Sequence, residues 1–469
     1  MNKVVSSVRE AVALSGLKDG MTVSFHHHLR NGDYVLNMVM EEIAQAGLRD
    51  ITVNASSLFD IHLPLLEHIK NGVVSGVAAD YISAGLGRAF SLGVLNKPVE
   101  FRTHGGRPYD IARGRTPIDV AFIAAPTADA MGNCTGKIGR SACGSLGYAF
   151  ADAQYAKTVV VITDNLLSHP LEDPSIPAEL VDYVVRVDAI GDPKGIVSGT
   201  TRITRDPVGL VMAAHAARVI EASGLLKDGF SFQTGAGGAS LATAKFLKDI
   251  MLNKGIQGSF GLGGITGYMV DMLRAGCFTE LRDVQCFDLG AVESIRTDPR
   301  HHEISATQYA APGGHATVND LDVVILGATE IDTEFNVNVH TDSNGVIMGG
   351  SGGHSDTAAG AKLSMIIAPM FRARLPIVTD RVTCISTPGR DIDVLVTQGG
   401  IAVNPKKREL KERLLNARLP IVDIVELKVK TEKITGVPCK PKKNDRVVAN
   451  VIGREGDLQD VIYQVSQDR

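Results

Sequence analysis

An internal repeat constrains the fold of this chain more than any other feature. Residues 15–25 read Ser-Gly-Leu-Lys-Asp-Gly-Met-Thr-Val-Ser-Phe, and residues 223–232 read Ser-Gly-Leu-Leu-Lys-Asp-Gly-Phe-Ser-Phe, which places their Asp-Gly pairs 209 positions apart. A helical pattern precedes each segment, and a polar or glycine-rich loop, a second helical pattern and a strand follow it. Such long-range similarity indicates a duplicated domain.

Two further matches occur in the same order. Residues 117–123 pair with 320–326 at an offset of 203, and residues 156–162 pair with 361–367 at an offset of 205. At roughly 150 residues per domain, a chain of 469 residues has room for two large domains. We therefore expect one α/β domain over residues 1–205 and a second, similar α/β domain over residues 206–469.

The expected strands are short continuous apolar runs that alternate with helical patterns. Examples are residues 159–162, 323–326 and 365–368. Runs of this kind are typical of parallel strands covered by helices on both faces, so each domain is predicted to contain an open α/β sheet. Since ligands of such sheets bind beyond the carboxyl ends of the strands, the loops to inspect follow Phe25, Phe232, Leu262, Leu326 and Ala368. The helices expected outside these runs cover residues 4–14, 34–45, 207–222, 240–251 and 406–417.

Glycine makes up 49 of the 469 residues, against about 7% in average proteins. Three loops of the second half concentrate it, and each adjoins an expected strand. Glycine lets a ligand approach the peptide groups closely, although simple turn chemistry is the alternative for any single loop. The sequence contains neither a dinucleotide-binding GxGxxG fingerprint nor a P-loop. The candidate positions are Gly235, Gly237, Gly238, Gly263, Gly264, Gly349, Gly350, Gly352 and Gly353.

A comparison of the two halves selects one carboxylate. Glu330 follows the strand at 323–326, and the matching position in the first half is Thr127, whereas Asp332 has a counterpart in Asp129. An acid shared by both halves suits a structural role, and an acid found in only one suits chemistry, for example as a nucleophile. Glu334 is also unique to its half. The alternative for Glu330 is a buried cap or salt-bridge acid.

The tract at residues 25–33, Phe-His-His-His-Leu-Arg-Asn-Gly-Asp, occupies the first-half position equivalent to residues 235–238. Neighbouring residues of an extended chain point to opposite faces, so only His26 and His28 share one. We expect no metal site, because no further ligands stand at a suitable spacing. An anionic substrate is the better fit, with two histidine donors and Arg30 as a bidentate clamp for a carboxylate.

Composition excludes several classes of protein. The net charge is −4, tryptophan is absent and aromatic residues make up 5%, which argues against nucleic-acid binding. The apolar runs are far shorter than the roughly 18 residues of a membrane span, and six cysteines without a CxxC pair suit reduced thiols in a cytosolic protein. Residues 404–443 carry a net charge of +7. This basic region is either a solvated helix face or a docking surface for an acidic partner.

Several segments together resemble the alpha subunit of bacterial citrate lyase across nearly the whole chain. That subunit belongs to the CoA-transferases built from two similar α/β domains. The most specific segment is Thr-Glu-Ile-Asp-Thr-Glu-Phe-Asn-Val-Asn-Val at 329–339. The others lie at residues 18–27, 125–127, 233–240, 262–266, 352–357 and 400–405.

The resemblance implies a citrate CoA-transferase with no tightly bound cofactor. Acetyl would be exchanged for citryl on the thiol of an acyl carrier protein, or of CoA, with release of acetate. Partners would be the beta subunit and the gamma (acyl carrier) subunit of citrate lyase, in a cytoplasmic homo- and hetero-oligomer. Glu330 is then either a covalent nucleophile or a positioning carboxylate beside a direct attack by citrate.

The implied site lies between the two domains. Peptide N–H groups of Gly349, Gly350, Gly352 and Gly353 would stabilise an oxyanion. CoA or the carrier arm would bind at Gly235, Gly237, Gly238, Gly263 and Gly264, and citrate at His26, His28 and Arg30. The alternatives are an acetate- or 4-hydroxybutyrate-type CoA-transferase or acyl-CoA hydrolase, and a non-catalytic scaffold that binds CoA or an anion.

Overall fold

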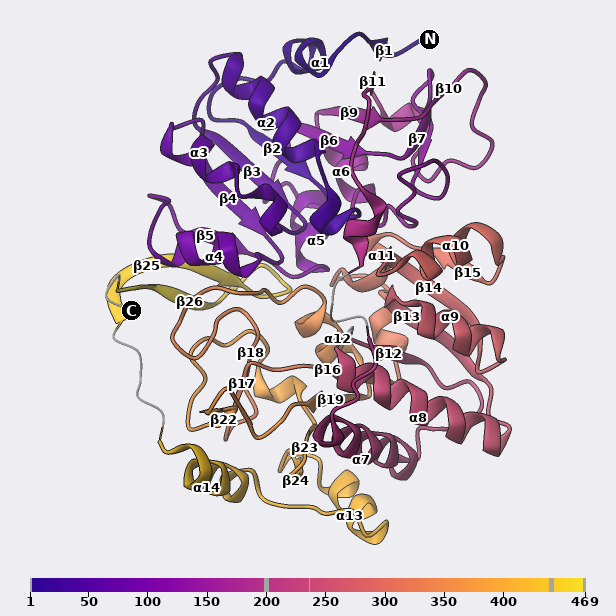
Figure 1. Cartoon of the computed structure of the whole chain (residues 1–469), viewed down its shortest axis with the longest axis vertical. Helices are drawn as coiled ribbons and strands as arrows, with labels where there is room; N and C mark the ends of the chain where they lie inside the picture. Colours follow the sequence, from indigo (N-terminus) through magenta and orange to yellow (C-terminus); the bar gives the residue numbers. More distant parts are fainter. Residues whose placement is uncertain (1, 198–201, 236, 438–442, 467–469) are drawn as a thin grey trace.

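Two large, mainly parallel sheets with a common strand order form the two halves of the chain in the computed structural model (Figure 1). The structure describes residues 2–197, 202–235, 237–437 and 443–466. Residues 438–442 of the predicted basic region 404–443 therefore fall outside the described residues.

The first sheet has ten strands. In spatial order they are β1 (Val4–Val5), β11 (Tyr183–Arg186), β9 (Thr158–Thr163), β6 (Val120–Ala124), β2 (Thr22–Phe25), β3 (Ile51–Ala55), β4 (Val74–Ala79), β5 (Val99–Phe101), β25 (Lys443–Ile452) and β26 (Leu458–Val465). The second sheet has eight. They are β15 (His301–Glu303), β14 (Phe278–Cys286), β13 (Gly258–Ile265), β12 (Phe232–Thr234), β16 (Val323–Leu326), β19 (Leu363–Ile367), β23 (Val394–Thr397) and β24 (Gly400–Val403).

The strand order confirms the duplication. The series β11-β9-β6-β2-β3-β4-β5 of the first sheet has the same arrangement as β23-β19-β16-β12-β13-β14-β15 of the second. The inner strands β6 and β16 are buried along their whole length, as expected for parallel strands covered by helices.

The duplication extends to a small sheet in each half. In the first half β7 (Thr127–Asp129) pairs with β8 (Cys134–Thr135) and β10 (Leu166–Leu167), and in the second β17 (Glu330–Asp332) pairs with β18 (Val337–Asn338) and β22 (Val378–Thr379). The acids common to both halves have the same structural task. A carboxylate oxygen of Asp129 accepts from three backbone N–H groups of its turn, and one of Asp332 accepts from two.

The helices follow the expected pattern, with one exception. Residues 34–45, 207–222 and 240–251 correspond to α2 (Val35–Gln45), α7 (Pro207–Ser223) and α8 (Gly238–Lys254). The helix expected from residue 4 instead begins with α1 (Val8–Leu14), because Ser7 caps it and the two residues at β1 pair with β11. The remaining helices are α3 (Leu65–Lys70), α4 (Ala84–Ser91), α5 (Gly106–Ala112), α6 (Phe150–Tyr155), α9 (Gly267–Arg274), α10 (Leu289–Thr297), α11 (Ala306–Ala310), α12 (His354–Gly360), α13 (Arg408–Asn416) and α14 (Ile424–Thr435).

The last two strands correct the expected division of the chain. Residues 206–469 were expected to form the second domain, but β25 runs parallel to β5 and extends the first sheet, with β26 beyond it (Figure 1). We call β25–β26 the terminal hairpin. It covers what would otherwise be the open edge of β5, and it buries Val448, Ala449, Val451 and Ile462.

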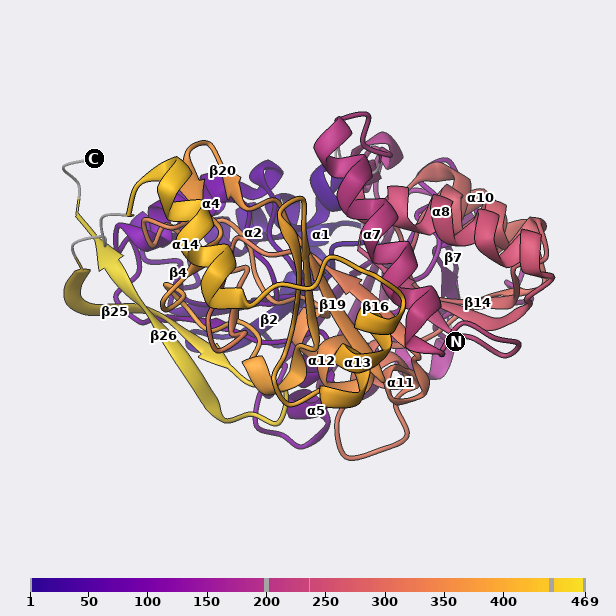
Figure 2. The same ribbon diagram turned by 90° about the horizontal axis from the view of Figure 1, so that it is seen from below.

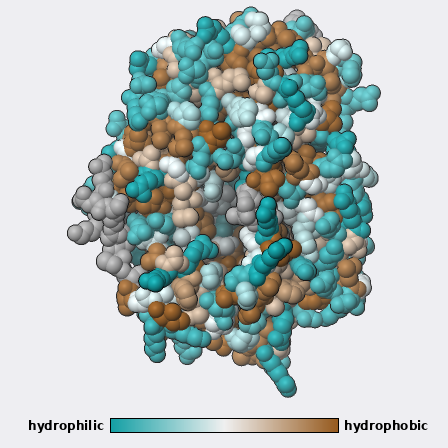
Figure 3. Space-filling view, in the orientation of Figure 1, coloured by the Kyte–Doolittle hydropathy of each residue, from teal (hydrophilic) through white to brown (hydrophobic). Residues whose placement is uncertain are grey.

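Helices α7 and α13 lie in front of the second sheet when the molecule is seen from below, and α14 lies beside its β24 edge (Figure 2). α7 packs on β19 and β23, and α13 packs on α7. Hydrophilic and hydrophobic residues are interspersed on the face shown in Figure 3. Within the described parts of the chain, none of the helices combines the length and apolar character needed to cross a membrane.

Candidate functional site

Glu330 is the first residue of β17 and is 3% exposed. Its Oε2 accepts from Asn338 Nδ2 at 3.0 Å and from the backbone N–H of Thr383 at 2.8 Å, and its Oε1 accepts from Thr383 Oγ1 at 3.2 Å. All three donors are neutral. Three hydrogen bonds from two neighbouring residues hold the buried Glu330 side chain in one orientation.

Residues 383–387, which we call the hub segment, connect Glu330 to the glycine loop at 349–353. Ser386 Oγ lies 2.6 Å from His340 Nδ1, and His340 Nε2 accepts from the backbone N–H of Ser351 at 3.3 Å. Ser355 Oγ donates to the carbonyl of Ser386 at 2.6 Å and lies 2.7 Å from Ser351 Oγ. The backbone of the hub segment, with hydrogen bonds at Thr383 and Ser386, thus joins Glu330 to the predicted oxyanion loop.

The glycine loop lies between the two halves. Ile82 N–H donates to the carbonyl of Gly349 at 3.2 Å, and His104 N–H donates to that of Gly352 at 2.9 Å. The N–H of Gly352 itself donates to the carbonyl of Asp80 at 3.1 Å, so in this structure it is committed to a backbone acceptor. A Cβ on Gly350 would lie 2.2 Å from the same carbonyl oxygen. Glycine at this position therefore permits close approach of the two halves.

The histidine tract follows β2 and is buried. Burial lowers the pKa of His26 to about 4, and it lowers the pKa values of His27 and His28 well below the ordinary range. All three rings are therefore neutral at pH 7. Neither ring nitrogen of His26 or of His28 has a hydrogen-bond partner among the described residues. Buried polar atoms normally have partners, so these rings leave donors and acceptors for a bound molecule or water.

Arg30 connects the histidine tract to the second half of the chain. Its backbone φ is +51°, in the left-handed region, and its guanidinium carbon lies 5.5 Å from the ring centroid of Phe59 and 4.9 Å from that of Phe287. Phe287 belongs to the second half, as does Gln285, whose Nε2 donates to the carbonyl of His27 at 2.9 Å. The expected meeting of the tract with the second half is thus present for Arg30 and for the backbone of His27.

On one side, aromatic rings link the histidine tract to the glycine loop. The rings of His27 and Tyr148 have centroids 4.7 Å apart, and those of Tyr148 and His104 are 4.4 Å apart. His104 Nε2 in turn lies 3.2 Å from the position that a Cβ on Gly352 would take.

On the other side, contacts run from the glycine loop back to Arg30. Gly353 faces the hydroxyl of Tyr309, which accepts from Gln233 Nε2 at 2.9 Å. Gly263 faces the side chain of Gln233, and its neighbour Gly264 faces the ring of Phe287. The contacts thus close a ring that includes the histidine tract and two of the three predicted glycine loops.

Several buried polar atoms around this ring have no partner among the described residues. They are Arg30 Nη1, Gln233 Oε1, Thr266 Oγ1 and Asp80 Oδ1, together with the nitrogens of His28. Burial also raises the pKa of Asp80, whose other oxygen is 2.9 Å from His104 Nδ1. Unpaired donors and acceptors drawn from both halves are the expected lining of a polar ligand site.

The remaining glycine loop stands at the start of α8, a helix of 17 residues. Gly235 donates its N–H to the carbonyl of Ile325 at 3.1 Å. Among the described residues outside its chain neighbours, a Cβ on Gly235 or on Gly237 would meet no atom closer than 3.7 Å, and Gly238 packs on the backbone of Thr204. The space beside Gly235 and Gly237 and the adjoining helix N-terminus suit an anionic group such as a phosphate.

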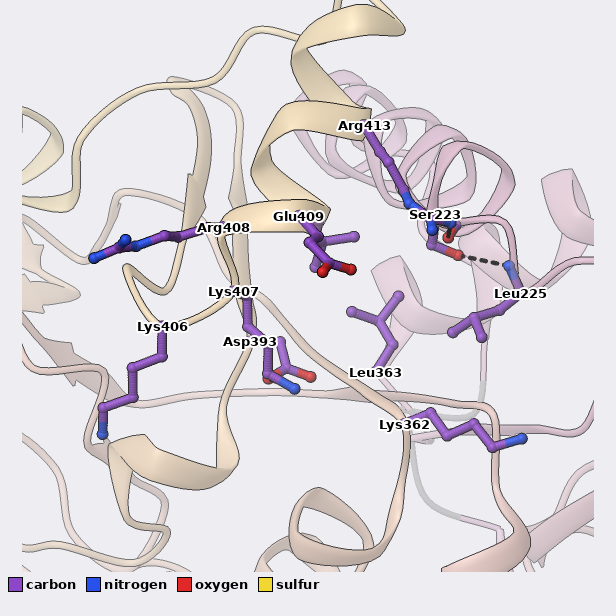
Figure 4. A pocket seen from close by; sticks show the side chains of 11 residues that line it. Ser223, Leu225, Lys362, Leu363, Asp393, Lys406, Lys407, Arg408, Glu409 and Arg413 are labelled. Atoms are coloured by element: carbon purple, nitrogen blue, oxygen red, sulfur yellow. Dashed lines mark hydrogen bonds and ion pairs between the residues drawn. The ribbon is translucent and has the colours of Figure 1, made fainter.

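The basic region lies near the start of β19, whereas the glycine loop at 235–238 follows the carboxyl end of β12. A pocket of about 470 Å³ is lined by Lys362, at the start of β19, and by Lys406, Lys407, Arg408 and Arg413 (Figure 4). Lys407 is already ion-paired with Asp393, whereas Lys406 and Arg408 are exposed. The expected helix at 406–417 is α13. Charge in this region is therefore available to a partner, but away from the glycine loops.

Comparison with known proteins gives the family. The family model for citrate lyase, alpha subunit, matches residues 1–465. The chain belongs to the citrate lyase alpha subunit family. It is 49% identical over 464 residues to the citrate lyase alpha chain of Klebsiella pneumoniae, a match that covers 99% of this chain and 91% of that one. It is 48% identical to the Haemophilus influenzae protein over 99% of this chain and 93% of the other.

Solved structures agree with the family. A crystal structure assigned to the alpha subunit of citrate lyase from Streptococcus mutans, in complex with citrate, has a TM-score of 0.98 and 47% identity, and the match covers 100% of this chain and 92% of that one. The alpha subunit of a malonate decarboxylase from Acinetobacter baumannii shares the fold, with a TM-score of 0.70 at 17% identity over 93% of this chain and 91% of that one. The two-domain α/β fold class expected from sequence is confirmed.

Sequence reasoning missed most of the side chains that join the site. Asn338 lies within the distinctive 329–339 segment, so its proximity to Glu330 had a local signal. Gln233 likewise lies within the 233–240 segment. Tyr148, His104 and Tyr309 carry no such signal, because each is an ordinary polar or aromatic residue that only the docking of the two halves brings into contact.

Proposed function

We propose that this chain is a citrate CoA-transferase that acts as the alpha subunit of a citrate lyase complex. The observation that carries the proposal is the connection from the buried Glu330, through the hub segment, to a glycine loop packed between the two halves. The citrate bound to the Streptococcus mutans relative supports the choice of substrate.

In this proposal citrate binds at the ring of contacts described above. Arg30 supplies the positive charge, and because burial keeps His26 and His28 neutral, they act as hydrogen-bond donors or acceptors and not as cations. The thiol carrier, CoA or the arm of an acyl carrier protein, places its phosphates at Gly235, Gly237 and Gly238 and passes along Gly263 and Gly264. The enzyme needs no tightly bound cofactor.

The net reaction exchanges two acids on one thiol. A carboxylate attacks the acetyl thioester carbon, the C–S bond breaks, and an anhydride and a thiolate form. In the direct route the attacking carboxylate is citrate, and the thiolate then attacks the citryl carbonyl of the acetyl–citryl anhydride, which gives the citryl thioester and releases acetate. In the covalent route the attacking carboxylate is Glu330, and the thiolate then attacks the glutamyl carbonyl of the acetyl–glutamyl anhydride and releases acetate. Citrate attacks the resulting glutamyl thioester and releases the thiolate, which finally attacks the citryl carbonyl of the citryl–glutamyl anhydride, giving the citryl thioester and free Glu330.

Free N–H groups of the glycine loop would stabilise the tetrahedral oxyanion of either route. The loss of one such donor costs about 10²–10³-fold in rate. Because the Gly352 N–H already donates to the carbonyl of Asp80, the N–H groups of Gly349, Gly350 and Gly353 would be the main donors to the oxyanion.

The direct test is to mix the purified protein with acetyl-CoA and citrate and to measure acetate release, with acetyl-carrier protein as a second donor. Replacement of citrate by acetate, propionate or 4-hydroxybutyrate tests the monocarboxylate alternative, and release without any acceptor acid tests hydrolysis. Binding of CoA without turnover on either donor would identify a scaffold instead. Hydroxylamine or borohydride labels the protein only if a glutamyl thioester forms, so the same reaction separates the two routes.

A further inference from the structure

The terminal hairpin contacts the hub segment through two polar side chains of β26. Asp460 Oδ2 accepts from the backbone N–H of Ile385 at 2.7 Å. Gln459 Nε2 donates to the carbonyl of Ile385 at 2.8 Å and to that of Ser386 at 2.9 Å. The two side chains thereby fix both peptide groups that flank Ile385.

Ile385 is only two positions from Thr383, which supplies two of the three hydrogen bonds to Glu330. The next residue, Ser386, holds His340 and, through Ser355, the glycine loop. The hub segment has little regular structure of its own. Its conformation therefore depends on hydrogen bonds from outside, and the terminal hairpin supplies three of them.

The hairpin itself is anchored on the first half. β25 pairs with β5, and Gln464 Nε2 of β26 donates to the carbonyl of Leu92 at 2.9 Å. At the turn between the strands, Arg454 lies 3.5 Å from Asp356 of α12. The hairpin thus extends the first sheet (Figure 1). Its Asp460 and Gln459 side chains contact the hub segment, whose Thr383 holds Glu330.

We infer that Asp460 and Gln459 are positioning residues for Glu330 and its glycine loop, a role that rests on the proposed part of Glu330 in acyl transfer. Because the hairpin is part of the first sheet, these two side chains fix the position of Glu330 in the second half relative to that sheet. Asp460 is the stronger element, because a carboxylate acceptor makes a charge-assisted hydrogen bond to an N–H group. A shift of about 1 Å in a catalytic group lowers turnover by roughly 10²-fold.

The test compares variants of the full-length protein in two measurements: citrate-dependent acetate release from acetyl-CoA, and hydrogen–deuterium exchange of the peptide that covers residues 380–388. We expect Asp460→Ala to lower kcat by about 10- to 10²-fold with little change in KM for citrate, and to speed exchange at Thr383 and Ile385. Asp460→Asn keeps an acceptor oxygen and should restore most of the activity. Gln459→Leu is the second variant, and it should speed exchange in the same peptide if Asp460→Ala does not fold.

The matched control is Gln464→Ala, which removes a hairpin hydrogen bond on the same strand without touching the hub segment. It should leave kcat and the exchange of residues 380–388 unchanged. Equal losses in Gln464→Ala and Asp460→Ala, or wild-type kcat and exchange in Asp460→Ala, would overturn the inference. If the wild-type protein releases no acetate, the proposed function fails, and the exchange measurement still decides whether the hairpin orders the hub segment.

Discussion

Arg30 and Phe287 belong to different halves of the chain, and the guanidinium carbon of Arg30 lies 4.9 Å from the centroid of the Phe287 ring. The same ring faces Gly264 at the end of β13. A cation held against an aromatic face in a buried place is both stabilised and fixed in orientation. The proposed substrate site is therefore complete only when the two halves are docked.

Arg30→Lys should raise the KM for citrate with a smaller effect on kcat. Lysine keeps the charge but loses the planar fork that binds a carboxylate through two hydrogen bonds. The loss of a hydrogen bond to a charged group costs about 1.5–3 kcal/mol, or roughly 10- to 10²-fold in KM. Arg113→Lys is the matched control, since that exposed guanidinium lies over Tyr109 on the surface. An unchanged KM in Arg30→Lys would remove Arg30 from citrate binding.

Glu330→Gln should lower turnover by at least about 10²-fold in the acetyl-CoA and citrate assay. Glutamine has nearly the same shape, so the melting temperature should stay close to that of the wild type while the charge is lost. Asp332→Asn changes the last residue of the same strand, β17. It should mainly lower the melting temperature, because the Asp332 carboxylate accepts hydrogen bonds from backbone N–H groups of the following turn. Wild-type turnover in Glu330→Gln would exclude Glu330 from the chemistry.

Gly350→Ala should lower the melting temperature and the activity together. The added methyl would lie 2.2 Å from the carbonyl oxygen of Asp80 in the other half, and overpacking of this kind costs about 1–3 kcal/mol. Gly314→Ala is the control, because a Cβ there would meet no atom of the described residues beyond its chain neighbours within 4 Å. The measurement is thermal denaturation of both variants beside the wild type. Equal melting temperatures for the two would show that the interface tolerates the methyl.

The free energy of unfolding should fall as the pH is lowered from about 6.5 to 4. Burial lowers the pKa of His26 and of His354 to about 4, whereas in the unfolded chain a histidine titrates near 6.5. Within this window the unfolded state binds protons that the folded state does not, so stability rises with pH at about 1.4 kcal/mol per pH unit for each proton. Chemical denaturation at several pH values measures the slope. His26→Leu should reduce it, and an unchanged slope would contradict this assignment.

Charge reversal of Lys406 and Arg408 should weaken the use of acyl carrier protein more than the use of acetyl-CoA. Both side chains are exposed beside the basic pocket (Figure 4), and an acidic protein partner gains more from such charges than a small substrate does. The measurement is KM for each donor at two salt concentrations. Lys227→Glu, an exposed change elsewhere in the second half, is the control. Equal effects on both donors would argue against docking at this surface.

Comparison of the two halves was more informative than any single motif. It assigned a chemical role to Glu330 and a structural role to Asp332, and the hydrogen bonds of Asp129 and Asp332 confirm that the acids shared by both halves are structural. Local signals also located the main helices and inner strands, because burial on one or both faces leaves a periodic trace in the sequence. They did not assign the terminal hairpin to the first sheet, since the sequence of a hairpin does not show which open sheet edge it covers.

The sequence by itself determined the duplication, the α/β class and the residues that differ between the copies, because each of these depends on the order of residues along the chain. Only the tertiary structure decided which of those residues meet. Asp356 accepts from Thr103 Oγ1 across 253 positions, and Asp460 accepts from Ile385 across 75. Contacts of this kind depend on how two buried surfaces dock, and neither partner carries a local pattern that identifies the other.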